Sequence, residues 1–155
     1  MVSIIEYSPR YLADFRQLNL EWLERYGLLE SHDTEMLDDP QAAILDLGGY
    51  ICLASIDGTI VGTAGLVPVL PSGPGNVYEL VKMSVAPSFR GQGISKLLVR
   101  HCLDKARAIG VSRLVLFSNS QLQTAISLYT QFGFQHVPVE DSPFQTADVK
   151  MELIL

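Results

Sequence analysis

The sequence predicts an α/β fold in a chain of 155 residues. Short β-branched runs, typical of strands, alternate with longer segments whose apolar residues recur every three to four positions, as in helices. Glycine, or proline after a capping residue, stands at several boundaries between these segments. The length predicts a single domain, residues 1–155, that can bury a sizeable core.

The first third of the chain is predicted to form one strand and two helices. Residues 2–7 are short and apolar, as expected of a strand. Ser8 and Pro9 form a typical helix start, and Gly27 ends that helix. Asp39 and Pro40 predict the cap of a second helix, which continues through Leu45. The first helix has one apolar face, made of Tyr11, Phe15, Leu18, Trp22 and Tyr26.

The rest of the chain continues this alternation. A tight-turn signal, Asp57-Gly58, separates two β-rich runs. The glycine- and proline-rich residues 71–76 are predicted to form a loop beside the next strand, where loops often shape substrate entry. The predicted order is a strand at 50–56, a strand at 59–69, a strand at 78–85, a helix from 94 to Gly110, a strand at 113–117, a helix from Asn119 to Gly133, a strand from Phe134 and a closing strand at 147–155.

The central unit of the chain is the strand at 78–85, a glycine turn and the helix that follows. Glycines 91 and 93 let the backbone approach a ligand closely, and the first amides of the helix have no partners within it. These amides and the helix dipole favour phosphate. The dinucleotide-binding pattern fails because Lys96 stands where its third glycine belongs, and the Walker pattern is absent.

This turn resembles the CoA-pyrophosphate loop of the GNAT superfamily of N-acetyltransferases, whose signature is Gln/Arg-x-x-Gly-x-Gly/Ala. Arg90, Gly93 and Ser95 fall on its fixed positions, with Ser95 in place of the usual Gly or Ala. The order of predicted elements is similar to the GNAT fold, which implies a mixed, mostly antiparallel sheet of about seven strands with helices on both faces. The resemblance implies acetyl-CoA as co-substrate, held by Arg90, Gly91, Gln92, Gly93, Ile94, Ser95 and Lys96.

The same resemblance implies further cofactor contacts. In the family this strand diverges from its neighbour, so backbone groups of Met83, Ser84 and Val85 are expected to bind the pantetheine arm. One of these amides would also polarise the thioester oxygen, a contribution of roughly 10²–10³ in rate. Asn119 is expected to contact the cofactor.

A second segment, from Ala125 to Phe134, resembles the family's Ala-x-x-x-Tyr-x-x-x-Gly-Phe motif. Carried over, Tyr129 is the general acid that protonates the departing thiolate. A phenol suits this role because its reference pKa of about 10 exceeds that of a thiol, about 8.5. The alternative is a tyrosine that only packs in the core.

An amine must lose a proton before it attacks. A lysine-like amine with a pKa of about 10.4 is over three pH units from neutral at pH 7, a cost of about 4–5 kcal/mol, so a base is expected. Glu79 is the candidate, because it shares a strand phase with Val81, Met83 and Val85 and so begins an otherwise apolar face. Burial there would raise its pKa. The alternative is an acid at the strand end that faces water.

Composition limits the classes of function. The formal charge is −6, which argues against a nucleic-acid partner, and residues 1–80 carry −9 whereas residues 81–155 carry +3. This asymmetry suits an anionic cofactor and a cationic acceptor, or an ordinary solvated surface. The acidic stretch 30–46 has no Lys or Arg, and it either attracts the amine or only caps helices.

No membrane span or signal peptide is predicted, and the two cysteines, Cys52 and Cys102, are expected to be buried free thiols in a reducing cytoplasm. The three histidines are scattered, so no metal site is predicted. The sequence therefore predicts a cytoplasmic acetyl-CoA-dependent N-acetyltransferase that transfers directly to a small-molecule or peptide amine. A non-catalytic acyl-CoA sensor of the same fold is the rival, and a homodimer is possible.

Overall fold

The computed structural model describes residues 1–70, 76–140 and 142–155. Its centre is a seven-stranded sheet in the order β1-β2-β3-β4-β5-β7-β6. Neighbouring strands run antiparallel except β4 and β5, which are parallel. The strands are β1 (Val2–Glu6), β2 (Tyr50–Ile56), β3 (Thr59–Pro68), β4 (Val77–Val85), β5 (Arg113–Ser118), β6 (Gln135–Val137) and β7 (Val149–Ile154). The predicted mixed, mostly antiparallel sheet is confirmed.

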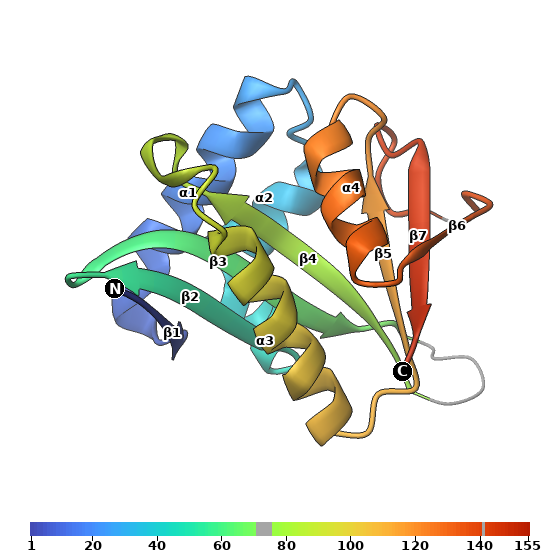
Figure 1. Ribbon diagram of the computed structural model, residues 1–155, viewed down its shortest axis with the longest axis horizontal. Helices are drawn as coiled ribbons and strands as arrows, with labels where there is room; N and C mark the ends of the chain where they lie inside the picture. The colour runs from blue at the N-terminus through green and yellow to red at the C-terminus, as the bar shows by residue number, and fades with distance from the viewer. Residues whose placement is uncertain (71–75, 141) are drawn as a thin grey trace.

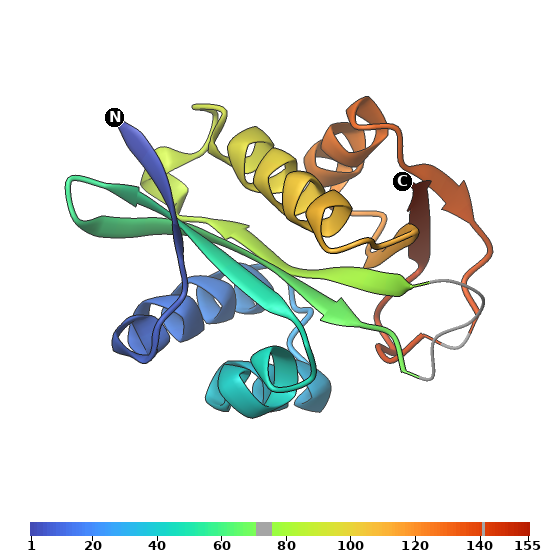
Figure 2. The ribbon, with the colours of Figure 1, turned by 90° about the horizontal axis from the view of Figure 1, so that it is seen from below.

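Helices cover both faces of this sheet (Figures 1 and 2). One face carries α1 (Leu12–Arg25), α2 (Ser31–Asp38) and the π-helical turn η2 (Gln41–Leu45), and the other carries α3 (Ile94–Ala108) and α4 (Gln123–Gln131). Two short 3₁₀ turns, η1 (Pro9–Tyr11) and η3 (Pro87–Phe89), precede α1 and α3. None of the helices in the described parts of the chain is long and apolar enough to cross a membrane.

The core consists of two apolar layers, because alternate side chains of a strand point to opposite faces. In β2, Cys52 and Ala54 join the layer under α3, whereas Ile51 and Leu53 join the layer under α1 and α2. All four side chains are fully buried. A strand buried on both faces explains why β2 reads as a continuous apolar run in the sequence.

Two predicted helices differ from the structure. The helix predicted from the Asp39-Pro40 cap through Leu45 is present only as the π-helical turn η2, at whose start Asp39 accepts the amide of Ala42 at 3.1 Å, and the helix α2 before it was not predicted. The last helix begins at Gln123 and not at Asn119, because the Asn119 carbonyl first accepts the amide of Leu122 in a turn. The predicted loop at 71–76 lies outside the described residues except for its last residue.

Candidate active site

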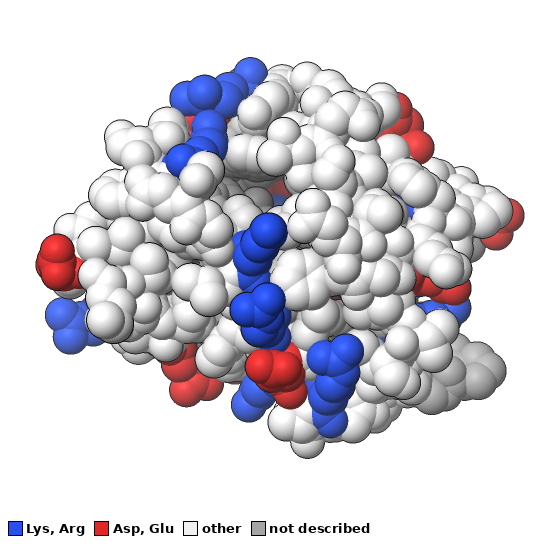
Figure 3. Space-filling model, viewed as in Figure 1, with Lys and Arg blue, Asp and Glu red and all other residues white. Residues whose placement is uncertain are grey.

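Strands β4 and β5 lie together at one end and diverge toward the other (Figure 1). The two strands are paired only from Val77–Arg113 to Glu79–Val115, although β4 continues to Val85 and β5 to Ser118. The separation leaves a cleft of about 700 Å³ between β4, β5, α1, α3 and α4. Figure 3 shows the hollow with basic side chains on its rim and along α3.

The glycine turn forms one end of this cleft. Gly91 and Gly93 have φ values of 79° and 80°, which L-residues rarely adopt, and Gly93 is the residue from which α3 begins. No side chain of the described residues caps α3, so its first amides, at Ile94, Ser95 and Lys96, are available to an anion. Every residue predicted for this loop lines the cleft except Gln92.

The Arg90 side chain connects the turn to β4 and to α1. Its Nε donates to the Val85 carbonyl at 3.0 Å, and its Nη2 donates to Glu21 Oε2 at 3.1 Å. The guanidinium also lies 4.8 Å from the centre of the Trp22 ring. Trp22 and Asn19 place α1 in the cleft wall; Trp22 was predicted only as part of an apolar helix face, and Asn19 was not predicted.

Strand β4 contains a bulge that the sequence did not predict. Thr63 pairs with Ser84 and Gly65 pairs with Val81, so β4 has one residue more than β3 between these pairs, and Lys82 has a φ of 53°. The expected common phase of Glu79, Val81, Met83 and Val85 is therefore wrong. Val81 joins the layer under α1 and α2, whereas Val85 joins the layer under α3. Met83, Ser84 and Val85 all line the cleft.

Glu79 lies at the point where the two strands part, and it is only 8% exposed. Burial raises the pKa of its carboxyl to about 7, and the Asp33 carboxylate adds to this rise. The Lys82 and Lys150 ammonium groups oppose it. Glu79 is thus a buried acid in the cleft wall that exchanges its proton near neutral pH, rather than an acid facing water.

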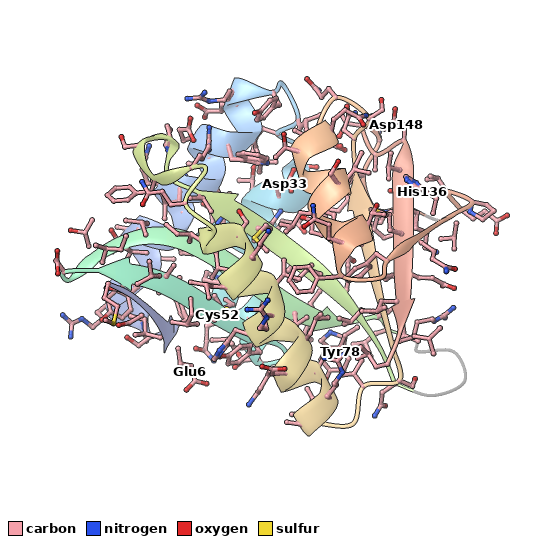
Figure 4. The ribbon with its side chains drawn as sticks, viewed as in Figure 1. Glu6, Asp33, Cys52, Tyr78, His136 and Asp148 are labelled. Carbon is pink, nitrogen blue, oxygen red and sulfur yellow. The ribbon has the colours of Figure 1, made fainter. Side chains whose placement is uncertain are left out.

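Lys82 and Asp33 form a buried ion pair beside Glu79, with side chains 5% and 3% exposed. The bulge brings Lys82 into the cleft, and α2 brings Asp33, which Figure 4 labels in the space between α1 and α4. Asp33 also accepts the Glu30 amide at 3.0 Å. Both residues are absent from the predicted site; the acidic stretch 30–46 indicated only that acids gather in this part of the chain.

Of the six acids in that stretch, only Asp33 lines the cleft. Asp38 pairs with Arg16 at 2.9 Å, and Asp39 caps η2. These acids therefore mainly cap helices and pair with neighbours, which is the alternative that the sequence left open.

Glu30 instead binds the segment that precedes β7. Its carboxylate accepts the backbone amides of Gln145 and Thr146 at 2.8 and 2.9 Å. Between these amides and β6 lies Phe144, whose ring contacts Phe117 at a centroid distance of 6.5 Å and stands 5.5 Å from the Lys82 ammonium. Phe117 and Phe144 thus form an aromatic wall of the cleft beside Lys82, and no pattern in the sequence indicates it.

Tyr129 and Asn119 reach the cleft from the α4 side. Tyr129 is 7% exposed and packs edge to face on Phe134 at 5.9 Å, and burial raises the pKa of its phenol, so it keeps its proton at neutral pH. Asn119 Nδ2 donates to the Thr146 carbonyl at 2.7 Å, and its Oδ1 accepts the Gln121 amide at 3.1 Å. The Asn119 side chain therefore supports the segment before β7, and its contact with a cofactor stays a prediction.

The two cysteines are buried free thiols beneath α3, where Figure 4 labels Cys52. Their sulfur atoms are 3.8 Å apart. The hydrogen bond with Cys52, followed by burial, raises the pKa of Cys102 well above its ordinary value, which disfavours the nucleophilic thiolate. Neither cysteine lines the cleft. Within the described residues, no group of three or more His, Cys, Asp or Glu side chains could hold a metal ion.

Comparisons with known proteins agree with this architecture. Residues 13–134 match the model of the acetyltransferase (GNAT) family. The chain is 36% identical over 137 residues to an uncharacterized N-acetyltransferase, YjgM, of Escherichia coli K12, covering 86% of this chain and 79% of that protein. It is 40% identical over 104 residues to rat N-acetyltransferase 8, covering 66% of this chain and 46% of the rat protein. The chain thus spans about half the length of this relative.

The fold is also that of YncA from Salmonella typhimurium, a putative acetyltransferase solved with its cofactor acetyl-CoA. The TM-score is 0.79 at 20% identity, and the alignment covers 99% of this chain and 94% of that one. The family match spans most of the chain and includes the glycine turn, β4 and Tyr129. The chain therefore belongs to the acetyltransferase (GNAT) family.

Proposed function

We propose that this protein transfers the acetyl group of acetyl-CoA directly to an amine, in a complex that holds both substrates. The observation that carries the proposal is that a buried carboxyl and a buried phenol, from two different elements, line one cleft. Glu79 lies on β4 and Tyr129 on α4, and both are buried and line the cleft. A cleft of about 700 Å³ with uncapped helix amides at one end suits an extended, phosphate-bearing substrate.

The cofactor contacts proposed for this chain follow from the same geometry. The amides of Ile94, Ser95 and Lys96 would hold the pyrophosphate at the positive end of α3. The backbone of β4 from Met83 to Val85 would hold the pantetheine arm, because β5 does not pair with that stretch. Acetyl-CoA supplies an activated thioester, so no acyl-enzyme nucleophile is required.

Glu79 would act as the base. Its carboxylate accepts a proton from the acceptor ammonium, and the resulting neutral amine attacks the thioester carbonyl carbon. When the tetrahedral intermediate collapses, the carbon–sulfur bond breaks and Tyr129 donates its proton to the leaving thiolate. The nitrogen then gives up its second proton, which restores the Tyr129 phenol, and Glu79 releases its proton to solvent. The products are an N-acetylated amine and CoA. The raised pKa of Glu79 and the protonated state of Tyr129 at neutral pH suit these two roles.

The decisive experiment mixes the protein with acetyl-CoA and a panel of amines, both small molecules and peptides, and detects free thiol. The proposal predicts CoA release above hydrolysis for at least one amine, together with a mass increase of one acetyl group on that amine. The variant Glu79→Gln with Tyr129→Phe controls for non-enzymatic release. Acetyl-CoA binding without release for any amine would instead support the acyl-CoA sensor. A cytoplasmic location, a single domain and a homodimer stay predictions.

A further inference from the structure

The bulge of β4 is held by a hydrogen-bonded network of buried polar side chains from three different elements. Asn19 on α1 donates from Nδ2 to Thr63 Oγ1 on β3 at 3.0 Å. Thr63 Oγ1 donates to the carbonyl oxygen of Lys82 at 2.7 Å, and it lies 3.1 Å from Ser84 Oγ. Asn19, Thr63 and Ser84 are at most 2% exposed. Lys82, the residue with positive φ, is thus fixed through its own carbonyl.

The chemistry of the groups determines which of these side chains donate and which accept. The Lys82 carbonyl can only accept, so the single proton of the Thr63 hydroxyl is used on it. Asn19 Nδ2 can only donate, so it occupies one lone pair of Thr63 Oγ1. The Ser84 hydroxyl must therefore donate to the second lone pair of Thr63. Ser84 then has only lone pairs left for the cleft, which it lines.

We infer that Thr63 and Asn19 are positioning residues for the acetyl-transfer site: they hold the β4 bulge, and with it the cleft-facing groups of Lys82, Met83 and Ser84. Neither residue was singled out in the sequence. The inference rests on the proposed function, because it assigns the bulged strand to acetyl-CoA binding. It also specifies the Ser84 hydroxyl as a hydrogen-bond acceptor, suited to an N–H donor of a ligand and not to an oxygen acceptor.

Such support is needed because β4 could instead form a straight strand without the bulge. A lysine with positive φ is strained, and a straight β4 would relieve that strain. A straight strand would also restore the strict alternation that the bulge breaks, and it would carry Val85 to the opposite face of the sheet. Lys82 would then leave Asp33, and the residues that line the cleft along β4 would change. The hydroxyl of Thr63 opposes this change from the neighbouring strand.

Thr63→Val and Thr63→Ser form a matched pair for the test. Valine keeps the shape of threonine but cannot donate to the Lys82 carbonyl, whereas serine keeps the hydroxyl and loses only the methyl group. We expect kcat/KM for acetyl-CoA in Thr63→Val to fall by about tenfold to a hundredfold, the loss typical of a misplaced reacting group. Thr63→Ser should stay within about threefold of wild type although it loses a buried methyl. A role in stability alone would lower the melting temperature of both variants without this split in kcat/KM.

Two further measurements separate this inference from the proposed function. Calorimetric titration with acetyl-CoA needs no acceptor, so weaker binding by Thr63→Val than by Thr63→Ser supports the inference even if no amine is acetylated. Amide hydrogen exchange of Met83 and Ser84 needs no ligand, and it should be faster in Thr63→Val. If Thr63→Val does not fold, Asn19→Leu, which removes one donor to Thr63, should weaken acetyl-CoA binding severalfold. Wild-type binding, turnover and exchange in a folded variant that lacks either bond would overturn the inference.

Discussion

Replacing Glu79 tests the proposed mechanism most directly, because stability and activity should both change with pH in a defined direction. Burial raises the pKa of the Glu79 carboxyl from its ordinary value of 4.5 to about 7. The folded protein therefore keeps this proton up to near pH 7, whereas the unfolded chain releases it near pH 4.5. Between these two pH values the folded state binds more protons, so this carboxyl makes stability fall as the pH rises.

The size of the effect follows from the two pKa values. Each step of one in pKa corresponds to about 1.4 kcal/mol, so above pH 7 the buried Glu79 carboxylate costs up to roughly 3 kcal/mol of folding free energy. Glu79→Gln has no proton to release. In urea unfolding it should exceed the wild-type stability by up to about 3 kcal/mol at pH 8 and nearly equal it at pH 4. A difference between the two proteins that is the same at both pH values would refute this reasoning.

Activity should respond to Glu79→Gln in the opposite sense. Only the ionised carboxyl can accept the proton of the amine, so wild-type kcat/KM for the acceptor should rise about tenfold per pH unit below pH 7 and level off above it. In Glu79→Gln this rise should disappear, and kcat/KM at pH 8 should be lower by about a hundredfold or more. Thiol release at saturating acetyl-CoA measures both quantities. An unchanged rise in the variant would exclude Glu79 as the base.

Three other substitutions probe separate parts of the cleft. Tyr129→Phe should lower kcat about a hundredfold with acetyl-CoA affinity nearly unchanged, and wild-type turnover in that variant would remove Tyr129 as the acid. Gly93→Ala and Gly110→Ala place a Cβ in open space at nearly the same φ, 80° and 82°, so both should lose similar stability, but only Gly93→Ala should weaken acetyl-CoA binding in calorimetry. Equal affinities in the two alanine variants would contradict the placement of the pyrophosphate at the glycine turn. Lys82→Met should lower the free energy of unfolding by about 3–5 kcal/mol, because the Asp33 carboxylate stays buried without its partner. It should also move the pH midpoint of activity above 7, because the Lys82 ammonium lowers the pKa of Glu79. An unmoved midpoint would show that this charge does not act on Glu79.

The sequence predicted the order of elements and the glycine turn because these features depend on local chemistry. Periodicity locates α1 and α3, and glycines 91 and 93 mark a backbone that other residues rarely adopt. The bulge at Lys82 has no such mark, because a lysine with positive φ is stabilised by Thr63, a residue nineteen positions away. The phase of β4 therefore could not be read from the alternation of its side chains.

The same distinction explains what was missed around the Lys82 end of the cleft. The contact between Glu30 and the amides of Gln145 and Thr146 joins residues more than a hundred positions apart. It brings Phe144 over Lys82, and no local pattern in either segment indicates this. Glu79, in contrast, could be singled out because an acid at the head of an apolar strand is itself unusual.

The position of Trp22 has a practical consequence. It is the single tryptophan of the chain, it lines the cleft, and the Arg90 guanidinium lies over its ring. Any molecule that enters beside the glycine turn changes the surroundings of this indole, so emission from the unlabelled protein reports occupancy without a coupled enzyme. The molecule thus contains its own optical probe, with which acetyl-CoA binding can be followed before any product is detected.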